Sequence, residues 1–195
     1  MKYLLLISLL FGSSLQGGNI RPSTPVAKPK NIILLIGDGM GLAQISAGYY
    51  ANGKKLNFEK FPFTGLITTH SSSHLITDSA AGATAFSCGC KTFNGAIGVT
   101  SKRKKCETIL EAAEAHGLAT GMVVSCSITH ATPASFIAHV DSRSEAEAIA
   151  ADFLKTDIDL MIGGGMRYFS ERKLDRRDLY ADPAQKGYQE SSFLD

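Results

Sequence analysis

A continuous apolar run at residues 31–36 (NIILLI) is the feature that most constrains how this chain can fold. A run without polar alternation is typical of a parallel strand that is buried on both faces. The run leads into a glycine-rich turn at residues 37–41, after which the pattern predicts a helix that ends near residues 52–53. Residues 31–53 are therefore expected to form a strand, a tight turn and a helix.

Apolar strands and helices continue to alternate along the rest of the sequence. Strands are expected at residues 65–70, 119–125 and 159–162, and helices at residues 107–116 and 144–154, with further helices opening at Ser79 and near Pro133. This alternation predicts an α/β fold with a mainly parallel central sheet and helices on both faces.

Length and composition limit the class of protein. The chain has 195 residues, which is enough for one substantial domain or for part of a larger one. A hydrophobic content of 44% with 19% charged residues is typical of a folded globular protein. The net charge of +2 is too small to indicate nucleic acid or an anionic membrane as a partner. The basic run at residues 102–105 is interpreted as a solvated loop.

The first 18 residues are expected to be a secretory signal. Lys2 precedes the apolar stretch 4–11, and small residues follow at 12–14. The stretch is far shorter than the ~20 apolar residues that span a bilayer. Residues 19–30 carry three prolines and are expected to form a linker. The mature protein is therefore predicted to be periplasmic or secreted, without stable insertion into a membrane.

Four cysteines follow the predicted signal, namely Cys88, Cys90, Cys106 and Cys126. An oxidising compartment permits disulfides, and four cysteines allow three complete pairings. The sequence leaves open whether these residues are free buried thiols, form one disulfide or, through the Cys-x-Cys spacing at 88 and 90, help to bind zinc.

Ser79 is the first candidate for chemistry. It stands at the predicted start of a helix rich in alanine and glycine, where unpaired N–H groups and the helix dipole favour an alkoxide or a phosphate. The alternative is a purely structural role, in which Ser79 caps the helix. A Gly-x-Ser-x-Gly nucleophile elbow is not present around this serine.

Asp38 is the second candidate, because it follows the first predicted strand at the edge where α/β sheets bind ligands. A dinucleotide fingerprint is disfavoured, since its sixth position is Leu42 instead of glycine. The structural alternative for Asp38 is a cap on the following helix. His70 and His74 have a spacing that suits a metal on a helix, but they are expected at a strand end and in a loop.

Several separate motifs, taken together and in this order, resemble the alkaline phosphatase family. They are IGDGMG at 36–41, TDSAAGATA at 77–85, KTFNG at 91–95, HATPA at 130–134, SR at 142–143 and GGG at 163–165. The resemblance covers approximately residues 31–172.

The resemblance implies a role for five residues. Ser79 matches the family's nucleophile, which becomes a phosphoserine, and Arg143 matches the arginine that grips the phosphate. Asp38 matches the carboxylate that bridges a zinc ion and the magnesium ion, and Thr132 matches a ligand of the magnesium site. His130 stands where some members carry aspartate and others histidine. The family's cofactors are two Zn²⁺ and one Mg²⁺, and histidine favours zinc over magnesium at the third site.

The implied activity is the hydrolysis of small phosphate monoesters with broad specificity, by a protein that is a homodimer when full length. Two alternatives stay open. One is a phosphodiesterase or sulfatase of the same superfamily, and the other is a phosphate- or nucleotide-binding protein that does not turn over its ligand.

One departure from the family concerns length. Family members are about twice as long, and their remaining metal ligands (histidines, aspartates and a glutamate) lie in the later half. Here no histidine follows His139, and the pattern Asp-x-x-x-His does not occur. Residues 31–195 are therefore expected to be the amino-terminal part of a catalytic domain, lacking most of the metal ligands and inactive alone.

Overall fold

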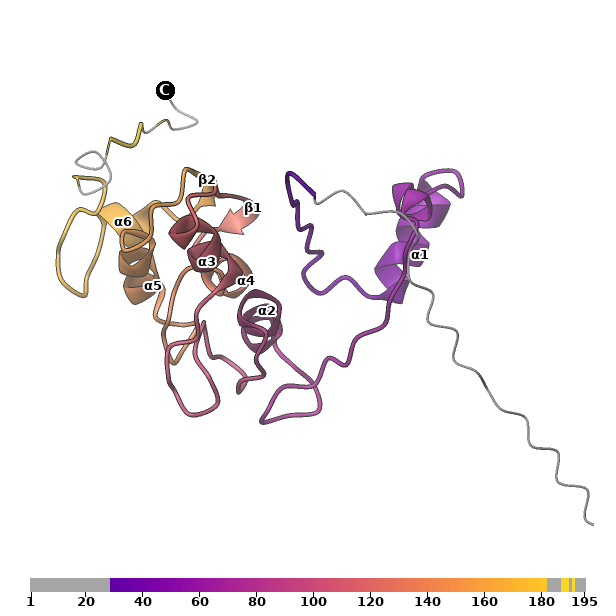
Figure 1. Cartoon of the computed structure of the whole chain (residues 1–195), viewed down its shortest axis with the longest axis horizontal. Coiled ribbons are helices and arrows are strands. Elements are labelled where there is room, and N and C mark those ends of the chain that lie inside the picture. Colours follow the sequence, from indigo (N-terminus) through magenta and orange to yellow (C-terminus); the bar gives the residue numbers. More distant parts are fainter. Residues whose placement is uncertain (1–28, 182–186, 190, 192–195) are drawn as a thin grey trace, which may run out of the picture. The chain divides into compact units, whose positions relative to one another are not determined.

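The computed structural model describes residues 29–181, 187–189 and 191. The predicted signal at residues 1–18, and nearly all of the predicted linker, lie outside these residues. The chain divides into two structural units between Ile36 and Gly37. The elements are α1 (Leu42–Ala51), the 3-10 helix η1 (Asn57–Lys60), α2 (Ser79–Cys88), α3 (Ile109–Ala115), β1 (Gly121–Ser127), α4 (Ala131–Ala134), α5 (Ala146–Phe153), β2 (Leu160–Gly164) and α6 (Arg167–Ser170) (Figure 1).

The α/β class is confirmed, with a sheet in which β1 and β2 run parallel. Gly121 pairs with Leu160 and Val123 with Ile162, after which the register slips so that Ser127 pairs with Gly164. Both strands lie within two residues of the ranges predicted from the sequence. A parallel pair requires a crossover connection, and α4 and α5 lie in it.

The glycine run that ends β2 is explained by a close approach between the two strands. A Cβ atom at Gly163 would lie 2.3 Å from Ile128 Cγ2 and 2.6 Å from Val124 Cγ2. No side chain fits at that separation, so this position needs a glycine. The close contact holds the end of β1 against β2, directly before the segment that carries His130 and Thr132.

Two of the predicted strands are wrong. Residues 31–36 and 65–70 form no strand, and the side chains of Ile32, Ile33 and Leu66 are 86%, 83% and 100% exposed. A strand is held by hydrogen bonds to a neighbouring strand. Within the described residues the sheet contains only β1 and β2. An apolar run without a pairing partner and without a face to cover it therefore gains nothing from the β conformation.

The predicted helices are confirmed with small shifts at their ends. Helix α3 begins two residues later than expected because Thr108 is its N-cap, with Glu111 completing a capping box. Gly117, which follows its end, has the left-handed φ of 68° expected of a helix-terminating glycine. Helix α1 ends at Ala51, with Asn52 as its C-cap, close to the predicted end, but none of its residues is buried.

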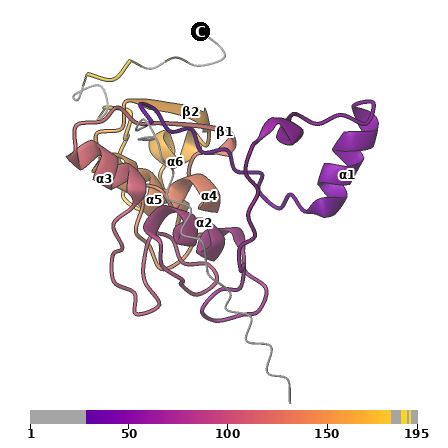
Figure 2. The same ribbon diagram turned by 45° about the vertical axis from the view of Figure 1, so that its right-hand side comes forward.

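The core lies around α5 and α6, where the rings of Phe153 and Phe169 meet edge to face at 6.2 Å. Helices α2 and α4 lie side by side in both views (Figures 1 and 2). Helix α2 packs closely on its neighbour, since Ala80 is buried and Ser135, directly after α4, donates to its carbonyl oxygen. This packing places Ser135, at the carboxyl end of α4, beside the first turn of α2. None of the described helices is long and apolar enough to cross a membrane.

Candidate active site

Ser79 is the first residue of α2, as predicted, but the helix is capped by Asp78. One carboxylate oxygen of Asp78 accepts from the N–H of Ala81 at 2.9 Å, and the other accepts from the N–H of Gly95 at 3.0 Å. The interpretation of Ser79 as the cap is therefore wrong. Its hydroxyl is left for another partner, at the positive end of a ten-residue helix.

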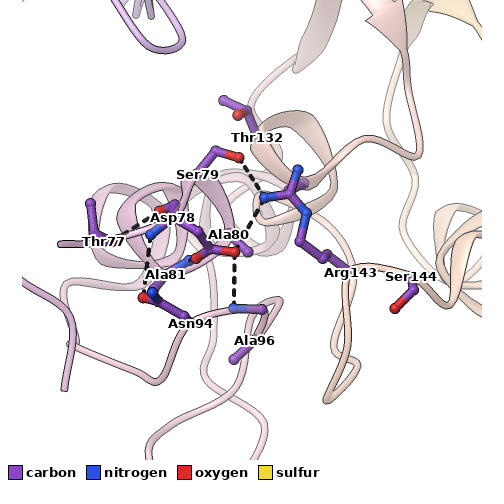
Figure 3. Close-up of polar contacts among 12 residues, drawn as sticks. Thr77, Asp78, Ser79, Ala80, Ala81, Asn94, Ala96, Thr132, Arg143 and Ser144 are labelled. Carbon is purple, nitrogen blue, oxygen red and sulfur yellow. Dashed lines mark hydrogen bonds and ion pairs between the residues drawn. The ribbon is translucent and has the colours of Figure 1, made fainter. Parts of the chain in front are cut away.

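That partner is Arg143, whose guanidinium group points at the start of α2 (Figure 3). Nη1 donates to Ser79 Oγ at 2.8 Å and to Asp78 Oδ2 at 3.2 Å. Nη2 lies 3.2 Å from Nε2 of His130. Both members of the Arg143–Asp78 ion pair are partly exposed. The arginine is thus held in place by charge while its planar group stays open to a ligand.

A turn at residues 93–96 fixes the spacing between these groups. The N–H of Ala96 donates to the carbonyl of Phe93 at 3.1 Å, and Gly95 has a φ of 89° that disfavours other residues. The carbonyl of Gly95 accepts from the backbone N–H of Arg143 at 2.8 Å. Asn94 accepts from the N–H of Asp78 at 3.2 Å. The KTFNG motif therefore supports both Asp78 and Arg143.

Asp38 and Thr132 form a second pair. The hydroxyl of Thr132 donates to Oδ2 of Asp38 at 2.6 Å. The alternative role of Asp38 as a helix cap is wrong, because Gly41 occupies that position and donates its N–H to Gln44 at 3.0 Å. Two oxygen ligands side by side suit a hard cation such as Mg²⁺.

The carboxylate of Asp38 also affects Cys126. Partial burial and the Asp38 charge raise the pKa of the Cys126 thiol, which therefore stays protonated at neutral pH.

His130 connects the two pairs. It is the N-cap residue of α4, two positions before Thr132, and its ring reaches Arg143. By contrast, the ring of His74 faces its own loop, where Nδ1 lies 2.7 Å from the hydroxyl oxygen of Ser73. Across the residues that the structure describes, no three or more His, Cys, Asp or Glu side chains gather in a group that could hold a metal ion.

Sequence reasoning named Ser79, Arg143, Asp38, His130 and Thr132, and the structure links them through two sets of contacts. It assigned no role to Asp78, Asn94 or Gly95. A signal for Asp78 was present, since an aspartate directly before a run of small helix-forming residues is a frequent N-cap. The contact from the Asn-Gly turn to Arg143 had no local signal, because it joins residues far apart in sequence.

Comparison with known proteins gives the family of this chain. A family model described as "Alkaline phosphatase" matches residues 29–189. The chain belongs to the alkaline phosphatase family. It is 38% identical to the repressible alkaline phosphatase of Saccharomyces cerevisiae, over 95% of this chain, and 39% identical to alkaline phosphatase 4 of Bacillus subtilis, over 83% of this chain. It spans only 36% and 38% of the length of these two relatives.

Solved alkaline phosphatases share its fold. The enzyme from the Antarctic bacterium TAB5 matches with a TM-score of 0.78 and 48% identity, over 81% of this chain and 46% of that chain. A variant of the TAB5 enzyme, described with Mg bound in its M3 site, matches with the same TM-score and identity over 80% of this chain and 45% of that chain. The similarity therefore covers most of this chain but less than half of each solved enzyme.

Proposed function

We propose that this chain carries the nucleophile and the phosphate-binding arginine of an enzyme that hydrolyses phosphate monoesters through a phosphoserine. The observation that supports this most directly is the 2.8 Å contact between Arg143 Nη1 and Ser79 Oγ at the start of α2. A serine oxygen beside a guanidinium and a helix N-terminus is placed where a phosphate would be stabilised.

The chemistry assigned to the chain's own residues has two steps. The Ser79 hydroxyl gives up its proton as its oxygen bonds to phosphorus, while the ester oxygen departs with the electrons of the broken bond and takes up a proton to form the alcohol. Water then attacks the phosphoserine, which releases inorganic phosphate and restores the Ser79 hydroxyl. Throughout, Arg143 donates to two phosphate oxygens, and Asp78 keeps its guanidinium oriented.

The proposal includes two Zn²⁺ and one Mg²⁺, which Asp38, Thr132 and His130 would help to hold. When bound, such ions lower the pKa of a coordinated oxygen and stabilise charge on a leaving oxygen. Asp38 and Thr132 supply the oxygen ligands that Mg²⁺ prefers. They are only two, however, and Mg²⁺ is bound by about six ligands. Further ligands are therefore required beyond those that the described residues supply, and we expect the chain on its own to bind zinc poorly and to be nearly inactive.

The remaining parts of the proposal concern context. Small phosphate monoesters are the substrate class, because nothing in the scheme reads the leaving group. We further propose export to the periplasm or the medium after removal of residues 1–18, and a homodimer for the full-length protein.

The nucleophile is tested in a full-length protein that contains this chain. Ser79→Ala should abolish the acid-stable phosphoenzyme that forms with radiolabelled phosphate ester, while bound zinc stays unchanged. Ser101→Ala, in an exposed loop, is the matched control and should retain the phosphoenzyme. Phosphoenzyme persisting in Ser79→Ala would assign the nucleophile to another residue. Phosphate binding without any phosphoenzyme in the parent protein would favour a binding protein.

The arginine is tested in the same protein by its affinity for inorganic phosphate. Arg143→Lys keeps the charge but loses the planar pair of donors, so product inhibition by phosphate should weaken roughly 10-fold or more. Arg103→Lys, which alters an exposed ion pair with Asp141, is the control and should leave inhibition unchanged. Equal inhibition constants for Arg143→Lys and the parent would remove Arg143 from the site.

The dependence on further ligands is tested on residues 19–195 alone. Atomic absorption should detect little bound zinc, and a chromogenic phosphate ester should be hydrolysed far more slowly than by an intact family enzyme. Two tightly bound zinc ions with full turnover would show that this chain supplies a complete site.

A further inference from the structure

Three of the four cysteines gather where α2 ends. Cys88 is the last residue of α2, Cys90 follows it after Gly89, and Cys106 approaches from the far side of the loop 91–105. The sulfur atoms of Cys90 and Cys106 lie 2.8 Å apart. All three residues are partly buried free thiols in this structure.

The backbone on both sides of this contact is fixed. Gly89 adopts the left-handed conformation and donates its N–H to Ala85 at 3.1 Å, which sets the direction in which Cys90 leaves the helix. Cys106 donates its N–H to Gly98 at 3.0 Å, next to the antiparallel bridge between Val99 and Lys105. The sulfur contact therefore results from the fold, and small side-chain rotations would bring the two atoms to the bonding distance of about 2.0 Å.

Cys88 is directed differently from the other two. Its sulfur donates to the carbonyl oxygen of Cys106 at 3.3 Å and lies 3.3 Å from the hydroxyl of Ser87. The thiol of Cys88 has these oxygen partners and also interacts with the Cys106 thiol, which donates to the Cys88 carbonyl oxygen at 4.0 Å. The sulfur–sulfur contact at 2.8 Å, however, joins Cys90 to Cys106.

We propose that Cys90 and Cys106 form a disulfide bond that closes residues 91–105 into a loop, while Cys88 remains a thiol. In forming the bond, each thiol loses its proton and the pair gives up two electrons. An oxidant of the disulfide class, such as oxidised glutathione or an oxidoreductase disulfide, accepts them and is reduced to two thiols. The proposal stands independently of the proposed catalytic activity.

The environment of the thiols sets the conditions for the reaction. Burial and the neighbouring Cys106 raise the pKa of Cys90 to about 12, and burial raises the pKa of Cys88 to about 11. The thiolate is the reactive form, so bond formation should be slow at neutral pH and faster as the pH rises.

The closed loop contains the turn that supports the candidate active site. Asn94 and Gly95, which hold Asp78 and Arg143, both lie between the two cysteines. A covalent link at the end of α2 would therefore restrain the same loop that positions groups at its start.

Disulfide mapping tests the pairing. The full chain is held in a buffer of oxidised and reduced glutathione, alkylated after denaturation and digested with trypsin and a glutamate-specific protease. We expect free thiols to fall from four to two per chain, with a linked peptide joining Cys90 to Cys106. The link should persist in Cys88→Ser and in Cys126→Ser. Four alkylated thiols, or a link from Cys88 to Cys106, would overturn the proposal.

Thermal unfolding tests the consequence of the tether. Reduction of the oxidised chain should lower its melting temperature by about 6–12 °C, the range expected for closing a loop of about 15 residues in a domain of this size. The double variant Cys90→Ser/Cys106→Ser should melt at the same temperature with and without reductant. A melting temperature of the parent chain that does not respond to reduction would contradict a tether between these residues.

Discussion

Residues 31–36 and β1 were both predicted as strands but have different structures. Both contain consecutive apolar residues, five in the run at 31–36 and three in β1. In β1, Met122 is 8% exposed and the backbone pairs with β2. In the run at 31–36, Ile32 and Ile33 are almost fully exposed, and no strand forms.

The difference shows what an apolar run requires to become a strand. β1 has a partner, β2, that returns to it through a crossover, and core residues to pack against. The run at 31–36 is also apolar, but the described residues of its own unit contain no strand with which it could pair. Because β propensity mostly reflects packing against neighbours, sequence alone predicts where a strand is possible, not whether it forms.

The largest expected effect comes from removing a side chain that β1 buries. Met122→Ala should lower the free energy of unfolding by about 2–5 kcal/mol, since it leaves a cavity under the strand. Urea denaturation followed by circular dichroism measures this change. A loss below about 0.5 kcal/mol, the level of an ordinary surface substitution, would mean that β1 is no better packed than the exposed run.

The next effect comes from forcing the two strands apart. Gly163→Ala adds a Cβ atom 2.3 Å from Ile128 Cγ2 and should cost about 1–3 kcal/mol of stability. Gly65→Ala is the control, because a Cβ atom there meets nothing within 4 Å. Equal unfolding midpoints for the two variants would show that β1 and β2 do not approach as closely in solution.

A smaller loss of stability is expected on acidification, when the carboxylate of Glu111 in α3 takes up a proton. Burial alone would raise the pKa of Glu111, but hydrogen bonds from Lys105, the Thr108 N–H and His139 lower it to about 2. The folded-state pKa lies below the ordinary value of 4.5. The stabilisation is therefore complete above pH 4.5 and is lost as the pH falls toward 2.

Thermal melts across this pH range measure the contribution. Glu111→Gln should lower stability at neutral pH and flatten its decline below pH 4.5. Glu107→Gln, at an exposed position one turn earlier, should keep the decline of the parent chain. An acid profile of Glu111→Gln that matches the parent would mean that the hydrogen bonds to this carboxylate do not contribute to the pH dependence of stability.

The smallest effect is expected in the exposed run itself. Ile33→Ala should change the free energy of unfolding by less than about 0.5 kcal/mol, because the side chain is already in solvent. The measurement is the same urea titration used for Met122→Ala. A loss as large as that of Met122→Ala would show that residues 31–36 are packed in solution after all.

Local patterns predicted those parts of the fold that depend on neighbouring residues in sequence. The start of α2 at Ser79, the glycine after α3 and the strand at Gly121–Ser127 all follow from caps, turns or apolar runs. The failed strands at residues 31–36 and 65–70 depended on partners distant in sequence, which no local pattern specifies.

In the candidate site, too, local patterns predicted some residues, while contacts between distant residues were not predicted. Ser79 and Asp38 stood out through their positions next to predicted elements, and the resemblance to alkaline phosphatases supplied Arg143, His130 and Thr132. The contacts that hold Arg143, from Asp78 and from Gly95, join segments separated by many residues. The structure shows these contacts, but the sequence alone did not predict them.

The double attachment of Gly95 has a consequence for thermal motion. One residue accepts from Arg143 through its carbonyl and donates to Asp78 through its N–H. When the turn fluctuates, it carries the arginine and the start of α2 in the same direction. The distance between Arg143 and Ser79 should consequently vary less than the position of either residue, because the same loop holds both groups.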